Sequence, residues 1–169
     1  MMMLLLFSFL HVTNDVIQSY VQAMPSPDPI IEPLLVQAEF SDVAKLGQVK
    51  IDNALVIALV ERWRPASHTF HLPVGECTIT LKDVDLQLGL SIDDRPITGP
   101  TYSNWEQTCT KYIGVVPTNN ALKGLTLKLK WLKEHMLTVP VKPTQQQLAG
   151  HCRAYILRLI GGVVMPNKL

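Results

Sequence analysis

The stretch from Asp52 to Leu90 constrains the fold most, because it carries local signals for a helix, a break, a β-hairpin and a second helix in that order. Asp52 can cap the first helix by accepting a hydrogen bond from a backbone N–H of the first turn. Pro65 ends that helix, since proline lacks an N–H and disfavours the α conformation at the residue before it. Between them, apolar residues fall at helical spacing on one face: Leu55, Val56, Leu59, Val60 and Trp63.

A β-hairpin and a second helix are predicted in the rest of this stretch. Two short runs rich in β-branched and aromatic residues, 69–72 and 77–80, flank turn residues at 73–76, which is the pattern of a hairpin. Thr80 then begins an approximate capping box, with Asp83 in the place of the usual glutamate. The apolar face and the C-terminal glycine of this helix are Leu81, Val84, Leu88 and Gly89.

Further elements are expected in the C-terminal half, so the fold is predicted to be mainly α-helical, α+β at most, with one small β-hairpin near residues 69–80. Ser103 or Asn104 can cap a short helix. Residues 125–131 alternate as a strand does, and the spacing becomes helical near Leu129. Thr144, with a glutamine at the capping-box position, opens a long helix. The apolar face of that helix comprises Leu148, Cys152, Tyr155, Ile156, Leu159 and Ile160, with Arg153 and Arg158 off it.

The composition is that of a globular chain of one domain. Of the 169 residues, 47% are hydrophobic and 17% are charged, which separates the chain from disordered sequences. The formal net charge of +1 argues against a strong hold on nucleic acid through charge alone, although a local basic patch stays open. The three cysteines, Cys77, Cys109 and Cys152, are far apart and odd in number, which fits reduced thiols inside a cell.

The first fifty residues divide into two segments. Residues 1–24 begin with an apolar run that lacks the basic start of a signal peptide and is too short to span a bilayer. An incidental start is expected there, with a targeting or membrane segment as the alternative. Prolines recur between Pro25 and Pro33, so residues 25–50 are interpreted as a Pro-rich linker followed by a short capped helix at 41–47.

Three blocks of the sequence resemble one family, the plant mobile domain. Its signature is similar to residues 61–90, which read ERWRPASHTFHLPVGECTITLKDVDLQLGL. The later blocks WLKEH (131–135) and AYILRLIGGVVMPNK (154–168) resemble the same family in the same order. Members are also labelled aminotransferase-like plant mobile domain proteins, maintenance-of-meristems-like proteins and long-form homologues of a plant serine/threonine phosphatase. Residues 51–169 are interpreted as a partial plant mobile domain, because the family's domain continues beyond these blocks.

The resemblance implies a non-enzymatic interaction module. Family members occur in transposable elements and in nuclear host proteins implicated in meristem maintenance, transposon silencing and regulation of gene expression. The resemblance implies protein partners, among them phosphatase-like and other mobile-domain proteins. From the residues themselves, no cofactor, small-molecule substrate or membrane partner is expected. Two alternatives stay open: a transposon-encoded accessory protein that binds nucleic acid, and a truncated copy without a function of its own.

Arg62, Trp63 and Arg64 are the candidate interaction surface. An exposed tryptophan between two arginines would suit stacking on nucleic acid or a contact with a protein. In the alternative interpretation, Trp63 completes the apolar stripe of its helix, while both arginines face solvent or pair with Glu61. The alternative is the simpler of the two, because the spacing already places Trp63 on the stripe.

The sequence pattern assembles no catalytic, cofactor or metal site. His68, His71 and Cys77 could ligate zinc with a fourth ligand from a distant cysteine or histidine, and Cys77 with His71 could form a nucleophilic pair. Packing of Cys77, and of the histidines on either side of a buried Phe70, is the alternative for both. Asp93–Asp94 is interpreted as a solvated turn. The residues that pyridoxal phosphate chemistry or metallophosphatase chemistry requires are not recognisable.

Overall fold

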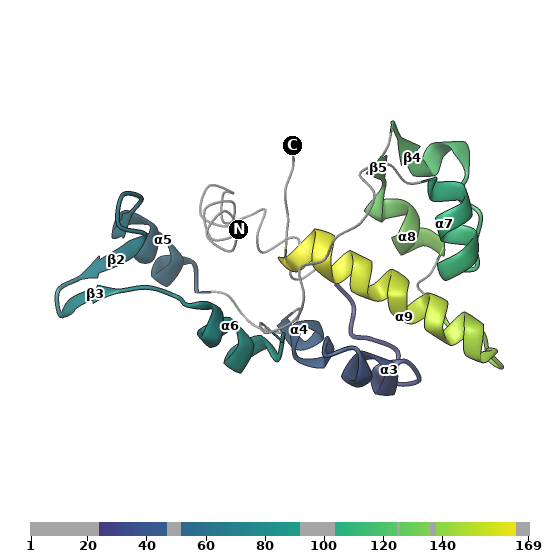
Figure 1. Cartoon of the computed structure of the whole chain (residues 1–169), viewed down its shortest axis with the longest axis horizontal. Helices are drawn as coiled ribbons and strands as arrows, with labels where there is room; N and C mark the ends of the chain where they lie inside the picture. The colour runs from purple at the N-terminus through teal and green to yellow at the C-terminus, as the bar shows by residue number, and fades with distance from the viewer. Residues whose placement is uncertain (1–23, 47–51, 92–103, 125, 136–137, 165–169) are drawn as a thin grey trace.

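The chain is mainly α-helical, as predicted, and its helices lie on both sides of one long central helix (Figure 1). The computed structural model describes residues 24–46, 52–91, 104–124, 126–135 and 138–164. The two expectations that fall on residues 1–23 and on Asp93–Asp94 lie outside these ranges. Within them, no helix is both long and apolar enough to cross a membrane.

The central helix is α9, Gln145–Leu159, which continues into a π-helical turn, η3, Ile160–Val164. It starts as the sequence predicts. The Thr144 hydroxyl accepts a hydrogen bond from the Gln147 backbone N–H at 3.3 Å, and the Gln147 side chain accepts one from the Thr144 N–H at 2.9 Å. This capping box satisfies backbone donors that would otherwise lack partners at the helix start.

One side of α9 packs against the N-terminal helices α3, Glu32–Gln37, and α4, Ser41–Lys45. The residues that were expected to form a linker therefore contribute directly to a hydrophobic core. Pro33 lies in the first turn of α3, where its missing N–H leaves no hydrogen bond unmade. The buried members of this cluster are Met24, Ile31, Leu35, Val43, Ala44, Cys152, Tyr155 and Leu159.

The other side of α9 packs against a second group of elements. These are α7, Trp105–Tyr112; the 3₁₀ turn η2, Asn119–Ala121; the two-stranded ladder of β4, Leu122–Lys123, and β5, Thr126–Leu127; and α8, Leu129–His135. The change from strand to helix at residue 129 confirms the spacing argument. The buried members of this second cluster are Cys109, Ile113, Ala121, Leu127, Trp131, Leu132 and Ala154.

Residues 52–90 form an arm that extends away from these two clusters, except at its C-terminal end, where Leu88 and Leu90 pack against the first cluster (Figure 1). It consists of α5, Asn53–Glu61; a three-stranded antiparallel sheet of β1, Trp63–Arg64, β2, Thr69–Leu72, and β3, Gly75–Cys77; and α6, Leu81–Leu88. The hairpin of β2 and β3 was predicted, as were the Asp52 cap, the Thr80–Asp83 capping box and the left-handed Gly89.

Three local predictions were wrong in detail. Helix α5 ends at Glu61, and Trp63 belongs to β1, because its backbone pairs with Phe70 of the hairpin. The helix expected at 41–47 forms, but its N-cap is Phe40, which offers no side-chain cap. Arg158, expected off the apolar face of α9, is buried, because the segment before α3 folds over it.

Gly150 permits a close approach between α9 and the backbone of Ile113, directly after α7. A Cβ atom at this position would lie 2.4 Å from the Ile113 carbonyl oxygen and 3.0 Å from its carbonyl carbon. Both are backbone atoms, so the clash cannot be relieved by rotating a side chain. We therefore expect Gly150→Ala to lower the free energy of unfolding by about 2 kcal/mol, despite the better helix propensity of alanine.

Thermal and urea unfolding followed by circular dichroism will measure this effect. The matched control is Gly162→Ala, because no atom lies within 4 Å of the Cβ position at Gly162. We expect the control to unfold with the same midpoint as the original chain or a slightly higher one. Equal stability of the two variants would mean that α9 and α7 do not approach each other as closely as described.

Candidate functional site

Trp63 is the centre of the sequence-predicted interaction surface, and the structure buries it. Its side chain is 8% exposed and packs edge-to-face against Phe70, with the ring centroids 4.8 Å apart. The two residues are also direct cross-strand partners in β1 and β2. The indole is therefore part of the arm's own small core, as the alternative interpretation held, although a strand and not a helix positions it.

The two arginines beside Trp63 differ in their surroundings. The Arg62 guanidinium is half-buried and donates a hydrogen bond to the Ala58 carbonyl oxygen at 2.9 Å, which closes the end of α5. Arg64 is exposed. A partner at this place would meet Arg64 and the neighbouring surface of α5, and Trp63 would act by holding them in position. The role of Arg62, Trp63 and Arg64 in binding stays a prediction.

His71 and Cys77 do not face each other across the hairpin. The register pairs His71 with Glu76 and Phe70 with Cys77. Since neighbouring residues of a strand point to opposite faces, the His71 and Cys77 side chains lie on opposite sides of the sheet. His71 instead approaches Glu76, with 3.1 Å between Nε2 and Oε1. This arrangement does not build the nucleophilic pair that the sequence left open.

The remaining candidate ligands lie in separate places. Cys109 and Cys152 are buried in the two different clusters of the α9 body, and burial raises the pKa of both thiols. A raised pKa favours the neutral thiol, which is a weak nucleophile and a weak metal ligand. Among the described residues, no three histidine, cysteine or acidic side chains come close enough together to hold a metal ion.

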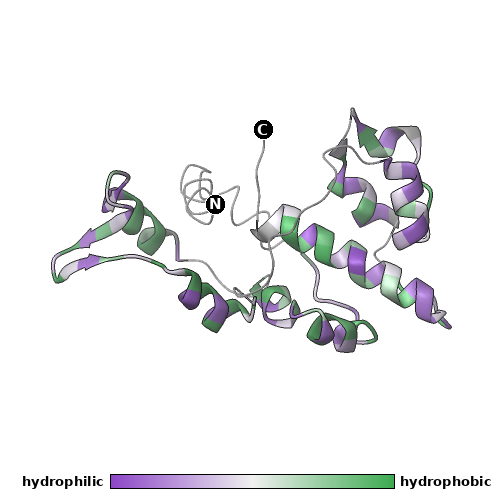
Figure 2. Ribbon diagram, in the orientation of Figure 1, coloured by the Kyte–Doolittle hydropathy of each residue, from purple (hydrophilic) through white to green (hydrophobic). Residues whose placement is uncertain are grey.

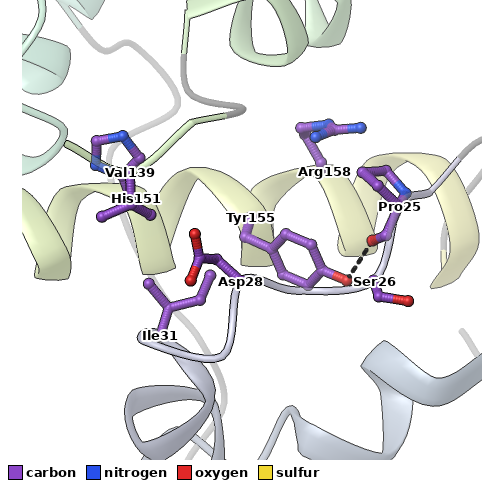
Figure 3. A pocket seen from close by; sticks show the side chains of 8 residues that line it. All are labelled: Pro25, Ser26, Asp28, Ile31, Val139, His151, Tyr155 and Arg158. Carbon is purple, nitrogen blue, oxygen red and sulfur yellow. Dashed lines mark hydrogen bonds between the residues drawn. The ribbon is translucent and has the colours of Figure 1, made fainter. Parts of the chain in front are cut away.

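A small pocket lies between α9 and the segment that precedes α3 (Figure 3). The α9 side contributes His151, Tyr155 and Arg158, which are spaced four and three residues apart and therefore share one side of the helix. The Tyr155 hydroxyl donates a hydrogen bond to the Pro25 carbonyl oxygen at 3.0 Å. The volume of about 30 Å³ suits roughly one water molecule and is far below that of an organic substrate site.

The sequence did not predict that His151 and Arg158 line the same pocket. His151 is buried, and its two ring nitrogens lie 2.9 Å from the Gln147 carbonyl oxygen and 3.1 Å from that of Thr138. It thereby ties the segment before α9 to the helix. Arg158 is 7% exposed and makes no hydrogen bond or ion pair with any described residue. The spacing of polar residues along the edge of the apolar face was the available signal.

The pocket predicts a pH dependence of stability. Burial raises the pKa of Tyr155 to about 12, and the nearby Arg158 cation opposes this rise. The folded state therefore keeps the proton between pH 10 and 12, where an unfolded tyrosine loses it. We expect the free energy of unfolding contributed by Tyr155 to be constant below pH 10 and to fall by at most about 2 kcal/mol as the pH rises to 12.

Urea unfolding of the original chain and of Tyr155→Phe across this pH range will isolate the effect. The variant lacks the hydroxyl, so its stability should lose the extra fall above pH 10. It should also be less stable at neutral pH by about 1 kcal/mol, because the hydrogen bond to Pro25 is gone. Parallel pH profiles of the two proteins would contradict the assignment.

The burial of Arg158 leads to a second prediction, in which a substitution leaves the free energy of unfolding unchanged or raises it. A buried cation that meets no hydrogen-bonding or ionic partner among the described residues is expected to destabilise the fold, and burial correspondingly lowers the pKa of Arg158. Arg158→Met keeps the aliphatic stem that packs beside Tyr155 and removes the charge. We expect an unchanged or higher free energy of unfolding, measured by urea titration. Arg153→Met is the control that should destabilise, since Arg153 donates to the Tyr112 carbonyl oxygen at 2.9 Å.

Comparison with known proteins identifies the family. The model of the plant mobile domain matches residues 39–169. Three relatives from Arabidopsis thaliana match about four-fifths of the chain. The "Serine/threonine-protein phosphatase 7 long form homolog" is 40% identical over 83% of this chain and 10% of its own length. "Protein MAINTENANCE OF MERISTEMS" is 37% identical over 80% of this chain and 30% of its own length. "Protein MAIN-LIKE 2" is 39% identical over 79% of this chain and 20% of its own length.

The match confirms the resemblance seen in the three sequence blocks. The chain corresponds to less than a third of the length of each of these relatives. No solved structure matches it. Since the family model covers most of the described residues, including the arm and all of α9, the chain belongs to the plant mobile domain family.

Proposed function

We propose that this chain is a non-enzymatic protein-interaction module of nuclear plant mobile domain proteins, with roles in meristem maintenance, transposon silencing and regulation of gene expression. Its partners in this proposal are proteins, including phosphatase-like proteins or other mobile-domain proteins. Support comes from the family membership and from one relative's name, which refers to the maintenance of meristems. The observation that carries the proposal is the exposed apolar surface of the arm.

Helix α5 is apolar around its whole circumference. Seven consecutive apolar residues, 54–60, make up most of the helix, and none of them is buried. Leu55 is 58% exposed and Ile57 is 49% exposed. A helix that is hydrophobic on all sides is normally enclosed by other protein or by lipid. The sequence of α5 is therefore suited to a groove that surrounds it, and the arm presents it away from the body (Figures 1 and 2).

Other elements of the arm also expose large apolar side chains. Leu86 on α6 is 75% exposed, and Leu81, Ile79 and Val74 are exposed along the hairpin and the start of α6. Figure 2 shows hydrophobic residues on both helices of the arm. A concentration of exposed apolar side chains marks sites of protein association. Arg64, the exposed arginine of the sequence-predicted interaction surface, also lies on the arm and is therefore part of the proposed contact surface.

A non-enzymatic role is supported by the placement of the reactive side chains. The buried cysteines have raised pKa values, and His71 and Cys77 point to opposite faces of the sheet. The pocket beside α9 has room for about one water molecule. The groups that could do chemistry in the described part of the chain thus lie apart, while several large apolar side chains of the arm are exposed.

The proposal is tested by affinity capture from nuclease-treated extracts of plant nuclei, with cytoplasmic extract in parallel. The bait is the full chain, compared with the double variant Leu55→Ser/Ile57→Ser. Both side chains are exposed, so we expect the free energy of unfolding to change by less than about 0.5 kcal/mol each. Proteins enriched from the nuclear extract by the original chain should fall at least tenfold with the variant, because buried apolar anchors dominate such interfaces.

The control is Val116→Ser/Val141→Ser, which removes exposed apolar residues outside the arm. It should capture the same proteins as the original chain. The proposal fails if no protein is enriched from nuclei over cytoplasm, or if the arm variant and the control capture the same set. Circular dichroism of each bait before capture keeps loss of folding separate from loss of contact.

A further inference from the structure

Charge is segregated along this chain, although its net charge is close to zero. Residues 24–91 contain five basic and nine acidic residues, a formal charge of −4. Residues 104–164 contain eight basic and two acidic residues, a formal charge of +6. The helix α9 separates the two parts of the body, with α3 and α4 on one side and α7 and α8 on the other (Figure 1). Residues 104–135, which precede α9, contain five basic and two acidic residues, so the side of the body that holds α7 and α8 is basic.

Four of these cations lie on consecutive elements of the chain, the β4–β5 ladder and the helix that follows it, and together they are called the lysine surface: Lys123, Lys128, Lys130 and Lys133. In the β4–β5 ladder Lys123 is paired with Thr126, so Lys128, two residues further on, shares that face. Helix α8 begins at the next residue. Its Trp131 and Leu132 are buried, which leaves Lys130 and Lys133, one turn apart, on the outer side. All four lysines are exposed.

Few carboxylates neutralise this surface. Glu134 is the one acidic residue between positions 107 and 164. It lies 3.8 Å from Lys130, and both side chains are largely exposed, so water and salt screen the pair. Within the described residues, the other three lysines make no ion pair. The positive potential of the lysine surface is therefore open to an external anion.

We propose that the lysine surface binds the phosphate backbone of double-stranded nucleic acid without sequence preference. Lysine acts as a point charge on a flexible stem, which suits phosphates spaced along a backbone. Protein interfaces, by contrast, favour arginine and are depleted in lysine. The aromatic residue of α8, Trp131, is buried and offers no platform for stacking single-stranded bases. The acidic part of the chain orients the duplex toward α8 by repulsion.

This inference does not depend on a protein partner at the arm, and it is tested on the purified chain alone. The measurement is fluorescence anisotropy of a short labelled DNA duplex of mixed sequence, titrated with the chain at several salt concentrations. Four phosphate contacts predict a slope of log K against log salt of about −3.6. A second duplex of unrelated sequence should bind with an affinity within about threefold, since no base is read.

Three lysine-surface variants and one control decide whether the lysine surface is responsible. Exchange of all four lysines for glutamine should weaken binding at least tenfold at low salt. Lys130→Gln/Lys133→Gln should make the slope shallower by about 2. The control Lys45→Gln/Lys82→Gln changes the net charge by the same amount on the acidic part of the chain, and it should stay within twofold of the original. Exchange of the four lysines for arginine should retain binding, and circular dichroism of the glutamine variant keeps loss of folding separate from loss of charge.

Several outcomes would overturn the proposal. One is the absence of duplex binding at low salt by the original chain. Another is equal weakening in the lysine-surface and control double variants, which would mean that net charge alone governs the interaction. A third is displacement of the duplex by polyglutamate as effectively as by unlabelled duplex at equal charge concentration, which would assign the lysine surface to acidic proteins.

Discussion

The body of this protein depends on α9 being packed on two sides at once. Cys152, Tyr155 and Leu159 enter one cluster, and Ala154 enters the other. A helix buried in this way needs small residues where a neighbour comes close, and Gly150 provides that space against the Ile113 backbone. Both clusters therefore include residues of α9, so unfolding of either cluster would leave one side of α9 without its packing partners.

The arm obeys a different constraint. Its internal contacts are few: the Trp63–Phe70 pair, the hairpin ladder and the two helix caps. They specify the shape of the arm but cover little of α5. An exposed apolar helix is costly in water, by roughly 25 cal/mol for each Å² left uncovered. The arm thus combines a well-specified backbone with exposed apolar side chains that no other part of the described chain covers, as expected of an element that docks on a partner.

The features that could be predicted from the sequence are those that depend on residues close together in the chain. The caps at Asp52, Thr80 and Thr144 were predictable, because each joins residues two or three positions apart. Strand β1 was not, because it exists only through pairing with residues that follow a turn. The burial of Arg158 depends on a segment some 130 residues away in the chain, the distance spanned by the Tyr155–Pro25 hydrogen bond. The lysine surface was missed for another reason: a whole-chain sum of +1 hides two parts of opposite charge.

These two surfaces lie toward opposite ends of the longest axis of the molecule, with the arm at one end and α7 and α8 at the other (Figure 1). A protein enclosing α5 would leave the lysine surface free, and a duplex along α8 would leave the arm free. The negative charge of residues 24–91 adds to this separation, because it repels a polyanion from the arm and from α3 and α4. If both contacts form, the shape and charge of the chain favour simultaneous binding over competition, and the module would link a protein partner to nucleic acid.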